Sequence, residues 1–405
     1  MGLRLGVCGC GAFARSFVPL FCAHPLVDEV VLADLIRERA DELAAKHGIA
    51  RVLGSLDELC DSDVDAIVML TQRQLHGPQV VQALRAGKHV YSAVPTGQTL
   101  DEIATIVNAV EETRLIYQIG ETSYYYPCTL YCRDRYRRGD FGDVFFGEAH
   151  YYHDMSHFYQ SFQRSGGPDW KQVAGIPPMH YPTHSTSMIL SVTGARAVSV
   201  SCQGWRDRSD DGVFQRGANL WDNVFSNESA LFETSDGGTM QINEFRRLGW
   251  NGKSSVQMNM YGTKGCYEEN ADSQLWCTIE RKDLLRLDEM LACRQLPIDE
   301  PQADVNESVL QEFHCGASEV HPVGRLPQEF VGLSNGHQGS HQFLVDDFLK
   351  AVTTNKLPPN HVWAAARYCA PGIVAHQSSE QGGERLSVPD FGNPPADWPL
   401  LNPDA

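Results

Sequence analysis

The sequence predicts an α/β fold in which an N-terminal doubly wound parallel sheet of the Rossmann type precedes an α+β domain with a large, mainly antiparallel open sheet. Up to about residue 120, short apolar runs alternate with amphipathic stretches; the runs are LRLGVCG, EVVLAD, DAIVML, KHVYSA and LIYQI. Continuous apolar strands between helices are typical of a parallel sheet covered on both faces. From about residue 140, SALFET, GTMQINEF and SVQMNMYGTKG alternate apolar and polar residues, which indicates antiparallel strands.

These patterns divide the chain into three segments. Residues 1–120 form the predicted Rossmann domain, and residues 121–380 form the second domain, which ends with helices at SHQFLVDDFLKAV and VWAAARYCAPGIVAHQSSE. Within it, residues 280–330 are acidic and interrupted by prolines, so we expect an insertion or a long loop. Residues 381–405 are rich in proline, which predicts an extended tail.

Composition and charge exclude several classes of protein. The 405 residues include 33 Lys+Arg and 51 Asp+Glu, and 33 − 51 gives a net charge of −18, which disfavours nucleic acid as a partner. No apolar run reaches about 18 residues and the start does not resemble a secretory leader, so we expect neither a membrane span nor export. Twelve cysteines without a CxxC pair predict reduced thiols and a cytoplasmic location.

A glycine-rich turn after the first predicted strand indicates a dinucleotide site. Its sequence, GCGAFA from Gly9, has the form GxGxxA and opens a helix. Gly9 permits the tight turn, and Gly11 lets a pyrophosphate approach the backbone. The helix N-terminus, with Ala12 and Phe13, supplies amide donors for the phosphates.

An acidic residue at the end of the second predicted strand favours NAD over NADP. Asp34 follows Gly11 by 34 − 11 = 23 residues, where its carboxylate can accept both ribose hydroxyls and would repel a 2′-phosphate. The alternative is a glycine turn in another kind of α/β protein, with Asp34 only capping a helix. Arg37 either stacks near the adenine or is solvated.

Several motifs, in order, resemble the glucose-fructose oxidoreductase and inositol dehydrogenase family, Gfo/Idh/MocA. They are VDAIVMLTQRQLHGPQVVQALRAGKHVYSAVP, YQIGETSYYYP, YGTKG and SHQFLVDDFLKAV. The resemblance implies a Rossmann domain that binds NAD and an open-sheet domain that carries the sugar site. It also implies that Thr71, His76, Pro95 and Glu121 lie at the cofactor.

The chain departs from the family pattern at two places. Gln72 and Arg73 replace the Pro and Asn of the family's Thr-Pro-Asn-x-x-His turn, and Val94 stands where ordinary dehydrogenases carry the catalytic Lys. Together with Glu121, this change looks like the branch of the family that contains NAD-dependent glycoside hydrolases.

A histidine pair in HYPTH supplies the candidate base. Counted back from Gly194, the resemblance places His184 on the family's active-site His and His180 on its usual Asp. The i, i+4 spacing predicts both rings on one helical face, pointing the same way. A neutral imidazole can accept a hydroxyl proton while hydride leaves, so we expect His184 to be the base, with a packing histidine as the alternative.

The segment GETSYYYP should lie at the domain junction. Glu121 follows the sixth strand and would orient the nicotinamide or relay a proton, unless it is a surface acid. Tyr124, Tyr125 and Tyr126 would line a sugar site by stacking, and the phenol of Tyr124 is the candidate for proton exchange.

Further polar residues leave alternatives open. His337 and His341 repeat the i, i+4 spacing and either reach the pocket or pack elsewhere, and Arg246 and Arg247 end a strand where they either meet an anionic substrate or are solvated. A metal is not predicted, because HxxxH lacks the Glu of the metalloprotease motif. The histidines that would permit one are His150, His153, His157, His180, His184, His337 and His341, with Asp154.

Three functions remain open from the sequence. The first is an NAD-dependent glycosidase that, as the resemblance implies, oxidises C3, eliminates the aglycone, hydrates the product and reduces C3 again with bound NAD. The second is an ordinary sugar or cyclitol dehydrogenase, and the third is a non-catalytic NAD-binding sensor. The expected partners are a small-molecule carbohydrate and further copies of this chain in a dimer or tetramer, with no membrane involved.

Overall fold

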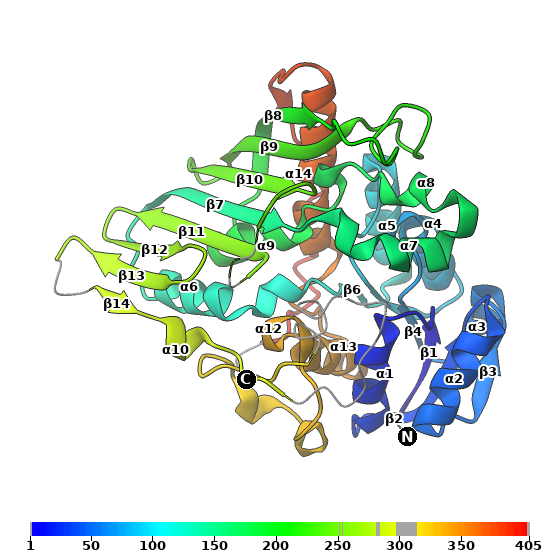
Figure 1. Ribbon diagram of the computed structural model, residues 1–405. Coiled ribbons are helices and arrows are strands. Elements are labelled where there is room, and N and C mark those ends of the chain that lie inside the picture. The colour runs from blue at the N-terminus through cyan, green and yellow to red at the C-terminus, as the bar shows by residue number, and fades with distance from the viewer. Residues whose placement is uncertain (1, 251, 253, 281–283, 297–313, 403–405) are drawn as a thin grey trace.

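The computed structural model describes residues 2–250, 252, 254–280, 284–296 and 314–402. Its first sheet, sheet A, has six parallel strands in the order β3-β2-β1-β4-β5-β6 (Figure 1). The strands are β1 Leu3–Cys8, β2 Val27–Ala33, β3 Arg51–Leu53, β4 Ala66–Met69, β5 His89–Ser92 and β6 Tyr117–Ile119. The helices between them are α1 Ala14–Ala23, α2 Arg37–His47, α3 Leu56–Asp61, α4 His76–Arg85 and α5 Leu100–Thr113.

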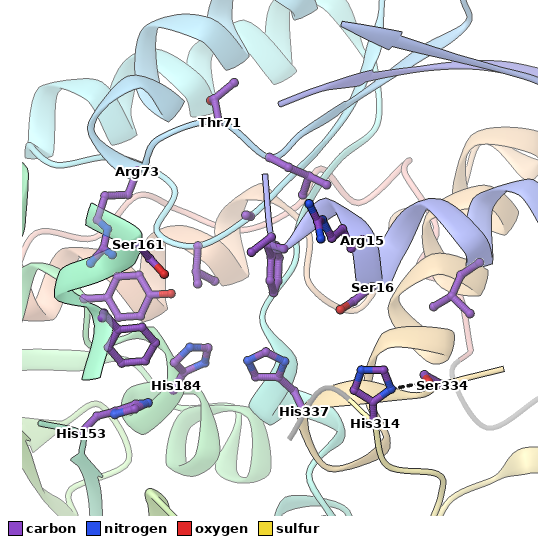
Figure 2. A pocket seen from close by; sticks show the side chains of 18 of the residues that line it. Arg15, Ser16, Thr71, Arg73, His153, Ser161, His184, His314, Ser334 and His337 are labelled. Atoms are coloured by element: carbon purple, nitrogen blue, oxygen red, sulfur yellow. Dashed lines mark hydrogen bonds between the residues drawn. The ribbon is translucent and has the colours of Figure 1, made fainter. Parts of the chain in front are cut away.

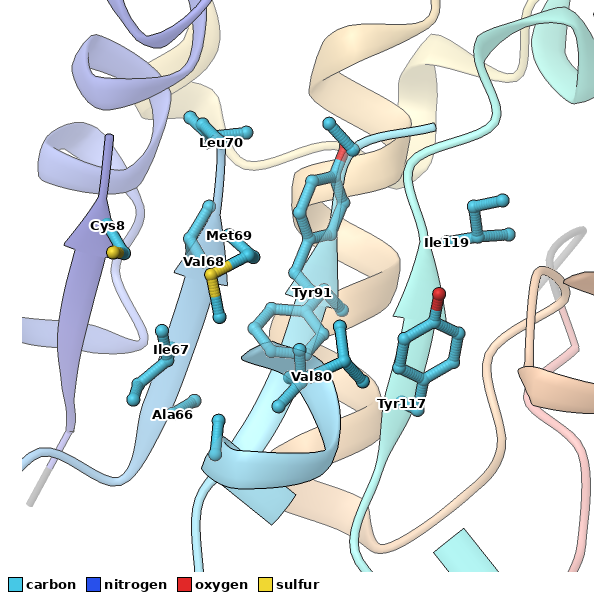
Figure 3. Close-up of a cluster of buried hydrophobic side chains, with 14 of the residues drawn as sticks. Cys8, Ala66, Ile67, Val68, Met69, Leu70, Val80, Tyr91, Tyr117 and Ile119 are labelled. Atoms are coloured by element: carbon cyan, nitrogen blue, oxygen red, sulfur yellow. The ribbon is translucent and has the colours of Figure 1, made fainter. Parts of the chain in front are cut away.

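The interior of sheet A explains why these runs form parallel strands. Val7, Val31, Val68 and Val90 on four adjacent strands have no exposed surface, so both faces of the sheet are covered. Figure 3 shows the side chains of β4 and β5, including Tyr91, packed among the neighbouring strands and helices. The strand order reverses between β1 and β4, and ligands of doubly wound sheets bind at the carboxyl edge there.

The second sheet, sheet B, has nine strands in the order β14-β13-β12-β11-β7-β10-β9-β8-β15. Every neighbouring pair is antiparallel except β7 and β10. This confirms the prediction of a Rossmann sheet followed by a mainly antiparallel one. The strands are β7 Val144–Tyr152, β8 Ala197–Arg206, β9 Phe225–Thr234, β10 Thr239–Phe245, β11 Val256–Gly262, β12 Gly265–Glu269, β13 Gln274–Thr278, β14 Leu285–Arg286 and β15 Leu386–Ser387.

Helices that follow the strands of sheet A in the chain cover one face of sheet B and join it to sheet A. In Figure 1, α6, α9 and α14 lie behind the strands, and α13 lies beside α1. Helix α14 packs against both α5 and β8, so it connects the two sheets. These helices are α6 Pro127–Arg137, α7 Tyr159–Gly166, α8 Lys171–Ala174, α9 Thr183–Thr193, α10 Asp288–Leu291, α12 Gly336–Gly339, α13 His341–Thr354 and α14 Val362–Glu380.

Two sequence segments of unusual composition take part in this framework. In the tail, β15 pairs with β8 at the edge of sheet B. Of residues 280–330, expected as an insertion or loop, 281–283 and 297–313 lie outside the described residues, and the remainder holds β14, α10 and a buried Phe330. Within the described ranges, no helix has the length and apolar content that crossing a membrane requires.

Candidate active site

The turn between β1 and α1 has the geometry of a phosphate cradle. Gly9 has a φ of +97°, and a Cβ there would stand 2.6 Å from the carbonyl oxygen of Leu70, so the position requires glycine. At Gly11 no atom lies within 4 Å of the position of a Cβ, so the backbone is open to a ligand. The residues present therefore fit a dinucleotide at the N-terminus of α1.

The predicted ribose acid connects this turn to the next loop. Asp34 accepts hydrogen bonds from the amides of Cys10 and Ile36, each at 2.7 Å. Its carboxylate thus lies beside the glycine turn, where the ribose-binding prediction needs it. Arg37 lies apart from the cavity described next: its side chain is exposed and pairs with Asp41 at 2.8 Å.

A cavity of about 650 Å³ extends from this turn to the start of α9, a volume typical of small-molecule sites. Its lining on the side of sheet A includes Ala12, Phe13, Arg15, Ser16, Thr71, Arg73, His76, Ala93 and Val94. Its lining on the side of sheet B includes Tyr151, His153, Phe162, Tyr181, His184, Arg246 and His337. Figure 2 shows Arg73, His153, His184 and His337 around the space between the two sides.

The cavity lining matches part of the predicted cofactor set. Ala12, Phe13, Thr71 and His76 line the cavity. His76 is held in place by two carbonyl oxygens, that of Pro95 at 2.9 Å from Nδ1 and that of Thr71 at 3.1 Å from Nε2. Pro95 therefore contributes a carbonyl that orients the His76 ring.

Glu121 and His184 form a buried pair in which His184 lines the cavity and Glu121 does not. Glu121 is fully buried and caps the 3₁₀ turn Thr122–Tyr125 by accepting the amide of Ser123 at 2.9 Å. The same oxygen, Oε1, lies 2.7 Å from Nδ1 of His184, near the start of α9. Because His184 lines the cavity and Nδ1 is held by Glu121, Nε2 is the nitrogen available for proton transfer.

The pair polarises the imidazole. Burial by itself would raise the pKa of Glu121, but the charge and hydrogen bond of His184 hold that pKa below the ordinary carboxyl value. Burial by itself would lower the pKa of His184, but Glu121 raises that pKa above the ordinary histidine value. A histidine oriented by a carboxylate in this way can accept a proton and is stabilised when it becomes an imidazolium.

The expectation that His180 and His184 share a helical face is wrong. Helix α9 begins at Thr183, and His180 belongs to the preceding 3₁₀ turn, so the i, i+4 rule does not apply. The ring of His180 packs 5.1 Å from the ring of His376, in a buried cluster with Glu228, and does not line the cavity. A catalytic role for His180 stays a prediction that this geometry does not favour.

Tyr124, Tyr125 and Tyr126 do not line this cavity, so the predicted tyrosine wall stays a prediction that the geometry does not favour. The ring of Tyr124 carries the Arg133 guanidinium 3.7 Å above it, and the hydroxyl of Tyr125 hydrogen-bonds Asp347. The first 3₁₀ turn after β6 directs these rings into the protein interior. A role for Tyr124 in proton transfer is therefore not favoured by its position.

Two other tyrosines take their place. Tyr151 at the end of β7 and Tyr181 before α9 line the cavity, each with its ring centroid 5.5 Å from that of His184. Sequence reasoning missed both, together with the placement of Arg73 and His153. Tyr181 lies inside HYPTH, and Arg73 is one of the departures from the family turn. Both residues therefore belong to motifs visible in the sequence, but the motifs do not reveal that these side chains line the cavity.

Two further histidines of the cavity, His153 and His337, have pKa values far below the ordinary histidine value. Burial, followed by the charge of His184, lowers the pKa of His337 to about 3. Burial, followed by the charge of Arg246, lowers the pKa of His153 to about 3. His341 does not line the cavity: its Nε2 lies 2.8 Å from Nδ1 of His337, and its ring centroid lies 4.3 Å from that of Phe17. Among the described residues, no group of three or more His, Cys, Asp or Glu side chains is placed to hold a metal.

Comparison with known proteins agrees with this architecture. Residues 3–121 match the family model described as "Oxidoreductase family, NAD-binding Rossmann fold", which confirms the resemblance found in the sequence. A glycosyl hydrolase family 109 protein 1 from Bacteroides fragilis strain YCH46 is 24% identical over 409 residues, spanning 96% of this chain and 85% of that protein.

Two solved structures share the fold. An oxidoreductase from Agrobacterium radiobacter in complex with NAD⁺, L-tartaric acid and magnesium superposes with a TM-score of 0.71 at 13% identity, covering 96% of this chain and 98% of that one. A levoglucosan dehydrogenase in complex with NADH and levoglucosan has a TM-score of 0.70 at 17% identity and covers 96% of this chain and 100% of that one.

Proposed function

We propose that this chain, whose residues 3–121 are the NAD-binding Rossmann domain of the Gfo/Idh/MocA oxidoreductase family, is an NAD-dependent enzyme that cleaves glycosides through a redox cycle at C3 of the sugar. The observation that carries the proposal is the Glu121–His184 pair in a cavity that continues to the glycine turn. The relative named glycosyl hydrolase family 109 protein 1 supports the same class of reaction.

Bound NAD would supply the hydride acceptor for C3 and return the hydride at the end of the cycle. The residues that would hold it are Gly11, Ala12 and Phe13 at the phosphates and Asp34 at the ribose, with Thr71 and His76 along the cavity wall. All of them lie in the loops that follow the strands of sheet A or at the start of α4. The sugar therefore belongs on the opposite side, next to His184 and the two tyrosines.

His184 is the base that the geometry favours. Its Nε2 would take the C3 hydroxyl proton when C3 is oxidised, while Nδ1–H donates to Glu121, whose charge stabilises the imidazolium. The resulting ketone acidifies the C2 hydrogen; loss of that proton and of the aglycone at C1 forms the enone. Water then adds at C1 and a proton returns to C2. Reduction of C3 takes back the hydride and the proton.

Val94 explains why a simple dehydrogenase is the second candidate. Its apolar side chain lines the cavity at the position where the sequence resemblance expects the dehydrogenase Lys. His337, neutral and next to His184, can hydrogen-bond a sugar hydroxyl without competing for the proton. His184 is thus the favoured base of the cavity, and His337 beside it stays neutral.

The proposal is tested with a panel of nitrophenyl glycosides, NAD and deuterium oxide. We expect aglycone release without accumulation of reduced NAD, and product that carries deuterium at C2 and hydrogen at C3. Cleavage without label at C2 would reject the redox cycle. Stoichiometric reduced NAD with an intact glycosidic bond would assign the chain to the dehydrogenases. NAD binding without turnover of any carbohydrate would favour the sensor.

We also propose that the chain forms a homo-oligomer through the open face of sheet B. Trp205 on β8 and Leu231 on β9 point to the same face and expose 45% and 52% of their surface. Sedimentation velocity should show a dimer or tetramer, and Leu231→Lys should shift it toward monomer. A wild-type monomer at micromolar concentration would refute this assembly.

A further inference from the structure

The charge of the cavity is opposite to that of the chain. Its described lining includes Arg15, Lys46, Arg73 and Arg246 but neither aspartate nor glutamate. This occurs in a protein with 51 acidic and 33 basic residues. A cationic cavity in an anionic protein indicates a negatively charged occupant.

Part of that charge lies where the cofactor phosphates are expected. Arg15 belongs to the first turn of α1, directly after the glycine turn, and Figure 2 shows it at some remove from Arg73 and His184. Arg73, from the side of sheet A, and Arg246, from the side of sheet B, instead lie against Tyr181 and Tyr151, next to the proposed sugar position. Their charge therefore needs a separate explanation.

Arg73 comes after β4 of sheet A, and its side chain lines the cavity. It begins the 3₁₀ turn Arg73–Leu75, and its guanidinium carbon lies 5.0 Å from the ring centroid of Tyr181 and 5.2 Å from that of Phe162. Among the described residues, the groups whose charges act on its guanidinium are Tyr181, Arg246 and Tyr151, with no carboxylate among them. Its planar donors are held between aromatic rings and remain available to an acceptor.

Arg246, directly after β10, approaches from the other sheet. It is 3% exposed, and its Nη2 donates to the buried Glu244 at 2.8 Å, whereas Nη1 is buried without a hydrogen-bond partner among the described residues. Its guanidinium carbon lies 4.4 Å from the ring centroid of Tyr151. An unsatisfied buried donor on a charged group is costly, so this atom is suited to a ligand acceptor.

The two arginines lie against neighbouring tyrosines in one region of the cavity, beside His184. Tyr151 and Tyr181 stack at 6.2 Å, each 5.5 Å from the ring of His184, and each carries one of the two guanidinium groups. The positive charge of Arg246 is close enough to disfavour that of Arg73. An anion between them would relieve this repulsion next to the base.

We propose that Arg73 and Arg246 bind an oxyanion carried by the sugar, so that the substrate is an acidic glycoside bearing a carboxylate, sulfate or phosphate group. That the ligand is a sugar rests on the proposed function. That the ligand carries a negative charge rests on the two arginines. The departure at Arg73 from the family's Asn then has a chemical reason. One guanidinium follows a strand of sheet A and the other follows a strand of sheet B, so the anion also fixes the sugar across the domain junction.

The test compares matched acidic and neutral ligands with the NAD-saturated protein. Methyl α- and β-glucuronides and galacturonides, with the 6-sulfates and 6-phosphates of the methyl glucosides and galactosides, are titrated by calorimetry against the neutral methyl glycosides. We expect the best acidic ligand to bind at least about tenfold more tightly than its neutral counterpart, as charge-assisted hydrogen bonds predict. The carboxylate, sulfate and phosphate series show which oxyanion fits.

Variants distinguish a specific effect of the two arginines on ligand binding from a general effect of net charge. Arg73→Gln and the double change Arg246→Gln with Glu244→Gln, which avoids stranding a buried carboxylate, should each remove most of the acidic preference. Arg85→Gln removes an equal charge from the exposed end of α4 and should leave the preference intact. Circular dichroism and NAD affinity confirm that each variant is folded.

Several outcomes overturn the inference. Equal binding of acidic and neutral ligands, failure of every acidic ligand to bind, or loss of the preference in Arg85→Gln would each do so. Competition between the anion and NAD would place the anion at the pyrophosphate site and would also reject it. Cleavage of neutral glycosides without acidic preference leaves the proposed function standing, whereas tight acidic binding without cleavage supports the arginine site and rejects the proposed function.

Discussion

The Glu121–His184 pair permits a quantitative prediction for Glu121→Gln. The amide retains the size of the side chain and can still accept the Ser123 amide, but it removes the charge 2.7 Å from Nδ1 of His184. A hydrogen bond to a charged group contributes about 1.5–3 kcal/mol, and at about 1.36 kcal/mol per factor of ten its loss in the transition state should lower kcat roughly 10- to 150-fold.

The pH profile gives the sharper readout of the same variant. Because Glu121 raises the pKa of His184, the apparent pKa of the acidic limb of kcat/KM in the wild type should lie above the ordinary histidine value of 6.5. Without that charge, burial lowers the pKa of His184, so the limb of Glu121→Gln should move to lower pH. The assay is aglycone release or NAD reduction across the pH range, with bound NAD held at saturation.

Stability should change with pH in a direction fixed by the same shifts. The pKa of His184 is raised in the folded state. Its contribution to the free energy of unfolding is therefore present below about pH 6.5 and is lost as the pH rises through the folded pKa. The pKa of Glu121 is lowered in the folded state. Its contribution to the free energy of unfolding is therefore present above about pH 4.5 and is lost as the pH falls through the folded pKa. The stability difference between wild type and Glu121→Gln should therefore be largest between these limits.

A second buried pair supplies the matched control. Glu228 lies 2.8 Å from Nδ1 of His376, is equally buried and does not line the cavity. Glu228→Gln should lower the melting temperature to a similar extent without moving the acidic limb. An unmoved limb and an activity within about threefold of wild type for Glu121→Gln would refute the role of the pair, since a lost charge-assisted bond predicts a larger change.

Four further variants test the base and the cofactor cradle. His184→Ala should lower turnover by about two to four orders of magnitude, as loss of a general base predicts, with NAD affinity by calorimetry little changed; near-normal turnover would remove the base from the mechanism. Asp34→Ala should weaken NAD by about 1–3 kcal/mol and narrow the preference over NADP; tighter binding of NADP by the wild type would contradict the ribose assignment. Gly9→Ala should destabilise the fold by about 1–3 kcal/mol in thermal denaturation, because its φ of +97° and the nearby Leu70 carbonyl oppose a Cβ. Gly11→Ala, in open space, should leave stability unchanged yet weaken NAD, and equal melting losses for both glycine variants would contradict this distinction.

Local pattern in the sequence was sufficient for the Rossmann domain and its cradle. Buried parallel strands require continuous apolar runs, and the turn at Gly9 requires a glycine, so both are visible without tertiary information. The alternation of polar and apolar residues likewise indicated sheet B. His184 and Glu121 were identified as separate candidates, through their positions in motifs.

The tertiary structure alone decided which candidates meet. Glu121 and His184 are 63 residues apart and contact each other only because the 3₁₀ turn after β6 packs against α9. That turn directs Tyr124 inward, and the late start of α9 at Thr183 separates His180 from the cavity. Arg73 follows a strand of sheet A and Arg246 follows a strand of sheet B, and no spacing along the chain records their proximity. A sequence determines which backbone conformations are favoured locally, whereas the direction of a side chain depends on how distant elements pack.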